Sequence, residues 1–500
     1  MRVRRAAAFV LTLIILPGLP AACARSRPAV PSVSVPAVDP LEQLRRDIVD
    51  TTRLPGVRRG AWGIVVHSLD RDERLVDLNS GTLLVPASIA KLVSVASAVD
   101  AVGWDHRFET TLRGTGPVLD GTLRGDLVIV GSGDPTIGGR GGEDLTPWID
   151  ALKAAGIRRV DGRIIGDDNA IEDPRPQLAW AWDDLGYTTG ALFGALNFGE
   201  NRMAIVIGAG TQAGAPATLT VEPHAAYRPL GNRVQTGPVG TTQLLWPEQR
   251  PGEPFLTIAG TIPAGAPPAR MNVAVGNPTF WFASVFRNRL LREGIEVTGE
   301  AWDIDDVAAP VGAPSGTVLY THRSPPLAAI VQPLLKDSIN VYGEAVMRLN
   351  ADAVVPATND AALAGLRRRL DSWGIPPDSQ QIIDGSGLSR RNTITADAMV
   401  VILRKMHDPS YASPFMTGLP IAAVDGTLGT RMRDTPAAGN VRAKTGTMSN
   451  IRSLAGYVTT LDGERLAFVV MVNNFEGSGA LGNQATDAIV VRLASFSRKQ

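Results

Sequence analysis

The secondary-structure pattern of the sequence changes twice along the chain, and these changes restrict the folds that the chain can adopt. Residues 41 to 105 contain strand and helix patterns, residues 106 to 305 consist mainly of glycine-punctuated strand patterns, and helical periods return within 306 to 500. Strand runs set between two mixed stretches predict an α/β domain built from two pieces, with a β-rich block inserted between them. A chain of 500 residues is long enough for two or three domains.

The inserted block itself divides into two parts. Residues 106 to 218 and 276 to 305 form an inserted domain II, and the Pro/Gly-rich residues 219 to 275 form a nested β-rich domain III. The outer pieces are more regular. A hairpin is expected at about 61 to 80, a helix from Ser88 to just before Gly103, and a helix that is interrupted at Pro333 and again around 337 to 340. Strands are expected within 441 to 460 and 464 to 474, followed by a terminal helix.

The first 24 residues have the layout of an export signal. Arginines at positions 2, 4 and 5 precede an apolar core at 6 to 16, and small residues follow at 21 to 24. Two alternatives remain open: cleavage after Ala24, or lipidation of Cys23, the only cysteine. Residues 25 to 40 are rich in Pro, Ser and Val and are expected to form a linker. The protein is therefore expected outside the cytoplasm, in the periplasm or cell wall, with a possible lipid anchor on the outer face of the membrane.

Composition excludes several function classes. There are 49 basic and 49 acidic side chains, so nothing favours nucleic acid or an anionic membrane as the main partner. The five histidines show no H-x-x-x-H spacing and one cysteine cannot build a thiolate site, so no metal and no cofactor are expected. The sequence has no G-x-S-x-G elbow, which disfavours a Ser-His-Asp hydrolase, and the glycine-rich GSGDPTIGG lacks the lysine of a phosphate loop.

Lysine is rare in this chain, and one lysine stands close to a serine. VPASIAKLVS at 85 to 94 places Lys91 three residues after Ser88, on the same face at the start of the predicted helix. A serine hydroxyl needs a base to become a nucleophile, and a lysine with a lowered pKa can be that base. Arginine cannot, because it keeps its proton in proteins. A single S-x-x-K is a weak signal, since a solvated helix lysine is the common explanation.

Two further motifs strengthen the signal. Ser338-Ile339-Asn340 lies at the interruption of the later helix, and Lys444-Thr445-Gly446-Thr447 lies on a predicted strand. Only six lysines occur in the chain, and two of them are the motif residues Lys91 and Lys444. S-x-x-K, S-x-N and K-T-G in this order are the three motifs of the penicillin-binding proteins and serine β-lactamases.

The wide separation of the first two motifs identifies a branch of these enzymes. A large insertion between Ser88 and Ser338 resembles the class C low-molecular-mass penicillin-binding proteins, the type 4 D-alanyl-D-alanine carboxypeptidase/endopeptidases. Other stretches are similar to the same family: GDLVIVGSGDPT at 125, WAWDDLGY at 180, HRSPPL at 322, DGSGLSR at 384 and DGTLGTR at 425. The resemblance covers about 41 to 495. It implies an α/β fold with a transpeptidase domain, in which helices flank an antiparallel sheet, and a nested β-rich insertion.

The resemblance also implies roles for the motif residues. Ser88 corresponds to the nucleophile that forms an acyl-enzyme, Lys91 to its base, and Ser338 to a proton relay. Asn340 would bind the substrate peptide and Lys91, and Lys444 would set the electrostatics of the site. The substrate-binding residues would be Thr445 and Thr447 for the terminal carboxylate, Gly446 because a side chain there would block substrate, and Asp167 and Arg390 as further candidates. The backbone N–H groups of Ser88 and Thr447 would form an oxyanion hole.

These roles predict a serine DD-peptidase that removes the terminal D-Ala from peptidoglycan stem peptides, cleaves D-Ala-linked cross-bridges, or does both, and that β-lactam antibiotics acylate. Two alternatives remain: a β-lactamase or esterase on the same fold, and a non-catalytic cell-wall scaffold. For Asp167 and Arg390, a structural salt bridge or a turn is the alternative role. The second motif has Ile339 where Asp or Asn is commoner, and Ile171 stands where an aromatic residue is expected.

Overall fold

A five-stranded antiparallel sheet is built from both ends of the chain. We describe a computed structural model that covers residues 39–140, 144–223, 230–250, 256–307 and 316–499. The hairpin of β1 (Ala61–Ser68) and β2 (Glu73–Leu78) forms as predicted, and β1 also pairs with β22 (Arg465–Asn473). β21 (Ile451–Thr459) and β20 (Arg442–Met448) complete the order β2-β1-β22-β21-β20. The N-terminal hairpin therefore depends on C-terminal strands for its pairing.

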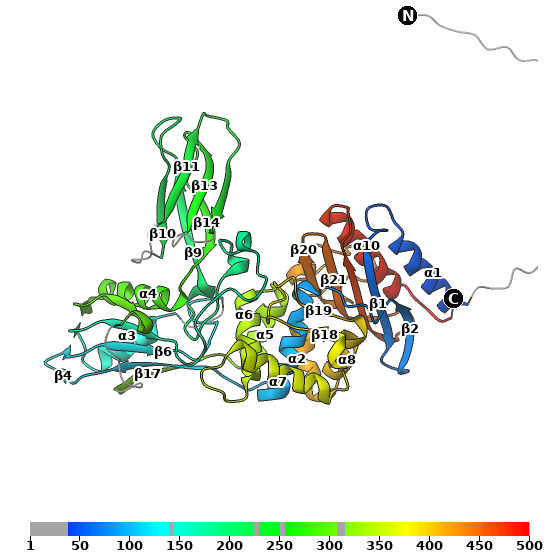
Figure 1. Cartoon of the computed structure of the whole chain (residues 1–500), viewed down its shortest axis with the longest axis horizontal. Helices are drawn as coiled ribbons and strands as arrows, with labels where there is room; N and C mark the ends of the chain where they lie inside the picture. The colour runs from blue at the N-terminus through cyan, green and yellow to red at the C-terminus, as the bar shows by residue number, and fades with distance from the viewer. Residues whose placement is uncertain (1–38, 141–143, 224–229, 251–255, 308–315, 500) are drawn as a thin grey trace, which may run out of the picture. The chain divides into compact units, whose positions relative to one another are not determined.

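Helices cover both faces of this sheet because its strands are apolar on both faces. Ile64 and Val66 of β1 pack into one core together with Leu44 of α1 (Pro40–Thr52) and Ile489 of α10 (Gly479–Ala494). Val65 points to the opposite core, as the period of two along a strand requires. Figure 1 shows α1 and α10 side by side on one face of the sheet. The predicted α/β fold, with helices flanking an antiparallel sheet, is confirmed.

The second face of the sheet is covered by further helices from the two outer pieces of the chain, residues 41 to 105 and 306 to 500. α2 (Ala90–Val102) lies there, buried from Ala90 to Val99, next to α8 (Ala396–Met406). The other helices of this layer are α5 (Leu327–Lys336), α6 (Asn340–Arg348), α7 (Asn359–Ser372) and α9 (Pro409–Gly418), and a small sheet joins β18 (Gln380–Gln381) to β19 (Thr393–Ile394). Pro333 lies inside α5, so the interruption expected at this proline is wrong; the helix ends at Lys336. Three residues then separate α5 from α6, and the second motif runs from this gap, with Ser338 and Ile339, into Asn340 at the start of α6.

The inserted block has its own core. Its main sheet has the order β16-β8-β6-β3-β17, and Trp148 of α3 (Thr146–Ala154) and Phe282 of α4 (Pro278–Arg292) pack in the core of the block. The strands of this sheet are β3 (Glu109–Gly114), β6 (Leu127–Val130), β8 (Ile164–Asp167), β16 (Ala301–Asp303) and β17 (Thr317–Arg323). A smaller sheet joins β15 (Glu296–Val297), β7 (Arg159–Val160), β5 (Thr122–Leu123) and β4 (Val118–Leu119).

A β module follows within the block. One of its sheets joins β10 (Thr218–Glu222), β9 (Arg202–Gly208) and β14 (Ala269–Ala274), and the other joins β11 (Gly231–Gly237), β13 (Thr257–Pro263) and β12 (Leu244–Glu248).

Two of the expected boundaries differ from the sheets. The boundary at 219 falls inside β10, whose partner β9 comes earlier, so the module's sheet begins at Arg202. The boundary at 306 precedes β17, which pairs with β3 and so extends the inserted sheet to Arg323. Alternation along a strand predicts the strand but not its partner, and the partner decides the boundary. The division into domains otherwise stays a prediction.

The predictions for the N-terminus concern residues that lie outside the described ranges. The export signal, Cys23 and most of the linker at 25 to 40 lie there. Within the described ranges, no helix combines the length and apolar character that crossing a bilayer requires.

Candidate active site

Ser88 lies in a tight turn that opens onto a buried helix. A 3-10 turn at Ala87–Ile89 leads directly into α2, and Ala87 has φ +49°, in the left-handed region. Two other backbone segments, at Gly387 and Gly446, pack closely against this turn. A Cβ at Gly387 would lie 2.1 Å from the carbonyl oxygen of Ala87, and a Cβ at Gly446 would lie 2.4 Å from that of Pro86. The position of Ser88 is therefore fixed by close backbone contact on two sides.

Lys91 lies beneath Ser88 and is completely buried. Its Nζ is 3.0 Å from Ser88 Oγ, 2.7 Å from Asn340 Oδ1 and 2.5 Å from the carbonyl oxygen of Ser386. Asn340 Oδ1 and the Ser386 carbonyl can only accept hydrogen bonds. A neutral lysine has two N–H groups, which satisfy these two acceptors. Its lone pair is then left for the hydroxyl proton of Ser88, which is the geometry that a general base needs.

Burial also gives Lys91 a suitable protonation state. It lowers the pKa of the Lys91 ammonium from 10.5 to about 7, although the negative charges of Asp384 and Glu344 oppose this shift. Burial likewise lowers the pKa of Lys444 well below its ordinary value, and the charge of Lys91 adds to the effect. Both motif lysines therefore lose their protons far more readily than exposed lysines do.

The second motif places a strained serine next to Lys444. Ser338 lies between α5 and α6 with φ +62°, a conformation that non-glycine residues rarely adopt. Its Oγ accepts a hydrogen bond from Lys444 Nζ at 2.8 Å. Asn340 begins α6 and donates from Nδ2 to the carbonyl of Thr189, in the inserted block, at 2.7 Å. The inserted block thus contacts the residue that also binds Lys91.

The third motif lies on β20, the last strand in the sheet order. Lys444 is buried, Thr445 Oγ1 lies 2.8 Å from Thr427 Oγ1, and Thr447 is exposed. The reason expected for Gly446 was that a side chain would block substrate. The structure adds a packing reason, because Gly446 is buried and a Cβ there would meet the Pro86 carbonyl oxygen.

A cavity of about 360 Å³ brings most of the predicted residues together. It is lined by Ser88, Asp184, Thr189, Asp337, Ser338, Asn340, Gly387, Leu388, Arg390, Thr427, Thr445, Thr447, Met448 and Ser449. Lys91, Lys444 and Gly446 do not line it and are buried. The two motif serines and Asn340 therefore open into one space, with the two lysines beneath the surface.

Of the two further candidates, only Arg390 reaches the cavity. Asp167 ends β8, is 6% exposed and accepts hydrogen bonds from the backbone and side chain of Asn169. It does not line the cavity. Two acidic residues line the wall, Asp184 and Asp337, and Asp337 is paired with Arg140 at 2.6 Å. Burial raises the pKa of Asp184, the charge of Asp183 adding to this rise and Arg390 opposing it.

Sequence reasoning did not single out several lining residues. Asp184, Thr427 and the pair Gly387 and Leu388 belong to three stretches that resemble the family, at 180, 425 and 384. Those stretches were the available signal. Met448 and Ser449 directly follow the K-T-G-T motif in the sequence, and this adjacency was their signal. Thr189 had none, since only the folded chain brings it to Ser88.

One group of carboxylates could hold a metal ion elsewhere in the inserted block. Ligand atoms of Asp168, Asp303 and Asp305 lie within 4.8 Å of one another. Burial raises the pKa of Asp168 to about 7, and raises the pKa of the other two carboxyls. Thr279 and Asn277 donate hydrogen bonds to this group. None of these carboxylates lines the cavity of Ser88.

A serine at the start of a buried helix, a buried lysine beneath it and a K-T-G strand beside it define a serine enzyme with the fold of penicillin-binding proteins and serine β-lactamases. Residues 44–496 match the model of the D-Ala-D-Ala carboxypeptidase 3 (S13) family. The chain belongs to this family and is a serine peptidase, a DD-peptidase of the D-Ala-D-Ala carboxypeptidase type.

Individual relatives agree with this assignment. A D-alanyl-D-alanine carboxypeptidase of Actinomadura sp. (strain R39) is 32% identical over 99% of this chain and 91% of its own length. The D-alanyl-D-alanine carboxypeptidase DacB of Haemophilus influenzae is 26% identical over 86% of this chain and 89% of its own. The crystal structure of penicillin binding protein 4 (dacB) from Haemophilus influenzae superposes with a TM-score of 0.78 at 24% identity, covering 90% of this chain and 99% of that one. That structure shares the fold.

Proposed function

We propose that this enzyme cleaves D-Ala-D-Ala ends, or D-Ala-linked cross-bridges, of peptidoglycan peptides through an acyl-enzyme on Ser88. The observation that carries the proposal is the contact of Lys91 with Ser88 at 3.0 Å, made by a buried amine whose other two acceptors are Asn340 and Ser386. The names of the relatives support the choice of substrate, since they are D-alanyl-D-alanine carboxypeptidases.

The reaction proceeds in two halves. Neutral Lys91 takes the hydroxyl proton as Ser88 Oγ bonds to the carbonyl carbon of the penultimate D-Ala. The C–N bond then breaks, and the proton that Lys91 took reaches the leaving amine through Ser338, whose hydroxyl gives one proton to the amine and regains one, while Lys444 holds Ser338 in place. In the second half Lys91, neutral again, takes a proton from a water whose oxygen bonds to the ester carbon. The ester C–O bond then breaks, and that proton returns to Ser88 Oγ. Backbone N–H groups of Ser88 and Thr447 bind the oxyanion, and such donors contribute about 3 kcal/mol each in other enzymes.

The two ends of the substrate meet different walls of the cavity. The terminal carboxylate binds at Thr445 and Thr447, which both line the cavity, with the buried Lys444 next to Thr445 on β20. Peptide lies along β20, which is the last strand of its sheet and pairs with β21 on one side. On the wall that carries Asp184 and Arg390, a carboxylate and a guanidinium bind the free amine and the free acid of the diamino acid side chain. Asp184 thus takes the role that was expected of Asp167.

β-Lactams are proposed to acylate the same serine. One neighbouring structure is penicillin binding protein 4 of Haemophilus influenzae with a bound β-lactam, and a relative from Dictyostelium discoideum is named a penicillin-sensitive carboxypeptidase. We also propose an extracytoplasmic location, since peptidoglycan is there. A lipid anchor at Cys23 is the finer alternative to cleavage after Ala24.

The decisive experiment is intact mass of the protein without residues 1–24 after incubation with benzylpenicillin, beside Ser88→Ala. A gain of one whole penicillin on the unmutated protein alone supports acylation of Ser88. No adduct with penicillin intact favours the scaffold, and no adduct with penicillin hydrolysed means a β-lactamase. Release of D-Ala from a peptide ending in D-Ala-D-Ala, lost in Ser88→Ala, then distinguishes the peptidase from an esterase.

A further inference from the structure

The backbone segment that accepts a hydrogen bond from Lys91 also donates hydrogen bonds, through its N–H groups, to a buried carboxyl. The carbonyl of Ser386 accepts from Lys91, while the N–H of the same residue donates to Glu344 Oε1 at 2.9 Å. The N–H of Gly385 donates to Glu344 Oε2 at 3.2 Å. Glu344 is 1% exposed and lies on α6, four residues after Asn340. One short helix therefore carries one acceptor of Lys91 directly and fixes the other through Glu344.

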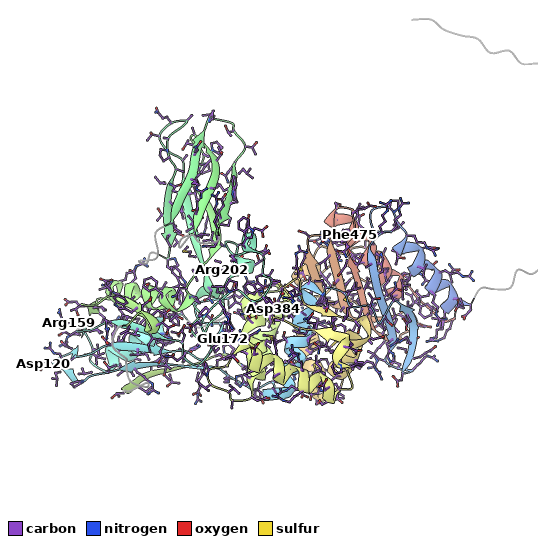
Figure 2. The ribbon with its side chains drawn as sticks, viewed as in Figure 1. Asp120, Arg159, Glu172, Arg202, Asp384 and Phe475 are labelled. Atoms are coloured by element: carbon purple, nitrogen blue, oxygen red, sulfur yellow. The ribbon has the colours of Figure 1, made fainter. Side chains whose placement is uncertain are left out.

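The packing leaves this segment little freedom. A Cβ at Gly385 would lie 2.2 Å from the carbonyl oxygen of Gly343, so the loop and α6 are in backbone contact. From the other side, Ser94 Oγ on α2 donates to the carbonyl of Gly385 at 2.8 Å. Asp384, which is labelled in Figure 2, accepts hydrogen bonds from the N–H groups of Gly387 and Ser389. Because the surrounding backbone cannot shift to compensate, a displacement of the Glu344 carboxylate would also displace the carbonyl of Ser386.

The charges around Lys91 come from three elements. Glu344 is on α6, Asp384 is on the loop, and Lys444 is on β20. Arg348, one turn after Glu344 on α6, faces the same carboxyl. Burial raises the pKa of Glu344 to about 7, and the charge of Asp384 adds to this, while Arg348 and the two N–H groups oppose it. The charge of Glu344 therefore acts on the protonation of Lys91, whose pKa it raises against the effect of burial.

We propose that Glu344 is a positioning residue for Lys91, which holds the Ser386 carbonyl against Nζ and through its charge sets the pH at which Lys91 becomes a neutral base. The inference deepens the proposed function and rests on Lys91 acting as the base for Ser88. A negative charge at Glu344 favours the ammonium form of Lys91. With a neutral residue at position 344, Lys91 loses its proton at lower pH, but the contact of the Ser386 carbonyl with Lys91 Nζ, which orients the amine, is weakened.

The test compares Glu344→Gln and Glu344→Asp with the unmutated protein by the pH dependence of acylation with benzylpenicillin. Glu344→Gln removes the charge and keeps one oxygen acceptor. We expect the acidic limb of the acylation rate to shift down by roughly one pH unit, and the plateau rate to fall on the order of tenfold because the carbonyl is displaced. Glu344→Asp keeps the charge but shortens the reach, so we expect a lower plateau with an unshifted limb.

A matched control is Glu172→Gln. Glu172 also contacts Arg348, at 3.2 Å, and a backbone N–H, that of Asn359, at 2.6 Å, but it has no contact with the Ser386 loop. Its variant should keep both limb and plateau. A second measurement does not depend on activity: [13Cε]lysine NMR of a chain with six lysines follows the titration of Lys91 directly, assigned by its loss in Lys91→Arg. Its midpoint should fall in Glu344→Gln and stay in Glu344→Asp.

The outcomes separate the two proposals. If the unmutated protein forms no penicilloyl adduct, the proposed function itself fails. If it does, and Glu344→Gln has the same limb and the same NMR midpoint, Glu344 has only a structural role and the inference is wrong, whatever happens to the plateau. Should Glu344→Gln not fold, Glu344→Asp decides: a plateau equal to that of the unmutated protein, or a shifted limb, overturns the inference.

Discussion

Gly446 and Pro86 are in backbone contact: a Cβ on Gly446 would lie 2.4 Å from the Pro86 carbonyl oxygen, two residues before Ser88. The K-T-G strand therefore lies directly against the segment that carries the nucleophile. This contact gives the glycine of the motif a packing role, and it predicts effects on both stability and acylation.

Gly446→Ala should push Ser88 out of place. We expect a loss of roughly 1–3 kcal/mol in the free energy of unfolding, the usual cost of an overpacked core, and penicillin acylation at least about tenfold slower, since the nucleophile is misplaced. Urea unfolding and stopped-flow acylation measure the two effects. Gly81→Ala is the control, because its Cβ would meet no atom within 4 Å. A variant of unchanged stability that fails only with peptide substrates would instead restore the substrate-clearance explanation.

Lys91→Arg should fold but not acylate. The site requires an amine that loses its proton near pH 7, which arginine cannot do. Removing a general base costs about 10²- to 10⁴-fold in rate, so we expect the penicilloyl adduct to form that much more slowly. Lys153→Arg, at a half-exposed lysine paired with Glu293, should acylate normally. Near-normal acylation of Lys91→Arg would assign the base to another group.

Burial of Lys91 also predicts how stability depends on pH. The pKa of Lys91 is lower in the folded chain, about 7, than its ordinary value of 10.5, so between these values the unfolded chain binds a proton that folded Lys91 does not. The free energy of unfolding therefore rises with pH across this window, and Lys444 acts in the same direction. In Lys91→Met, we expect part of this rise, a few kcal/mol, to disappear. Urea unfolding at pH 7 and pH 10 of both proteins measures it; equal slopes would contradict it.

Asp184 and Arg390 should select substrates without affecting the chemistry. Asp184→Asn and Arg390→Gln remove the charges proposed to bind a free amine and a free acid. We expect kcat/KM for a peptide with a diamino acid side chain to fall roughly 10- to 100-fold, typical of a lost charged contact, whereas acylation by benzylpenicillin changes little. Asp183→Asn is the neighbouring control for the first variant, since Asp183 does not line the cavity. Equal losses with both substrates would mean that these residues support Ser88 itself.

The sequence determined the parts of the site that are local. Ser88 and Lys91 are three residues apart at the start of a helix, so helix geometry alone places them on one face. Lysine rather than arginine at positions 91 and 444 indicates an amine that must lose its proton. The apolar, strand-forming runs near both ends predicted the strands of the central sheet, because alternation and β-branched residues are local signals.

The tertiary structure decided everything that depends on which distant segments meet. Strand pairing places the ends of the inserted sheets at other residues than the sequence boundaries at 219 and 306, since the pattern of a strand does not specify its partner. The fold also brings Asp184, and not Asp167, to the cavity wall, and it packs Gly446 against the backbone of Pro86. The pKa of Lys91 is equally a tertiary property, because burial and the charges of Asp384 and Glu344, all supplied by other elements, set it.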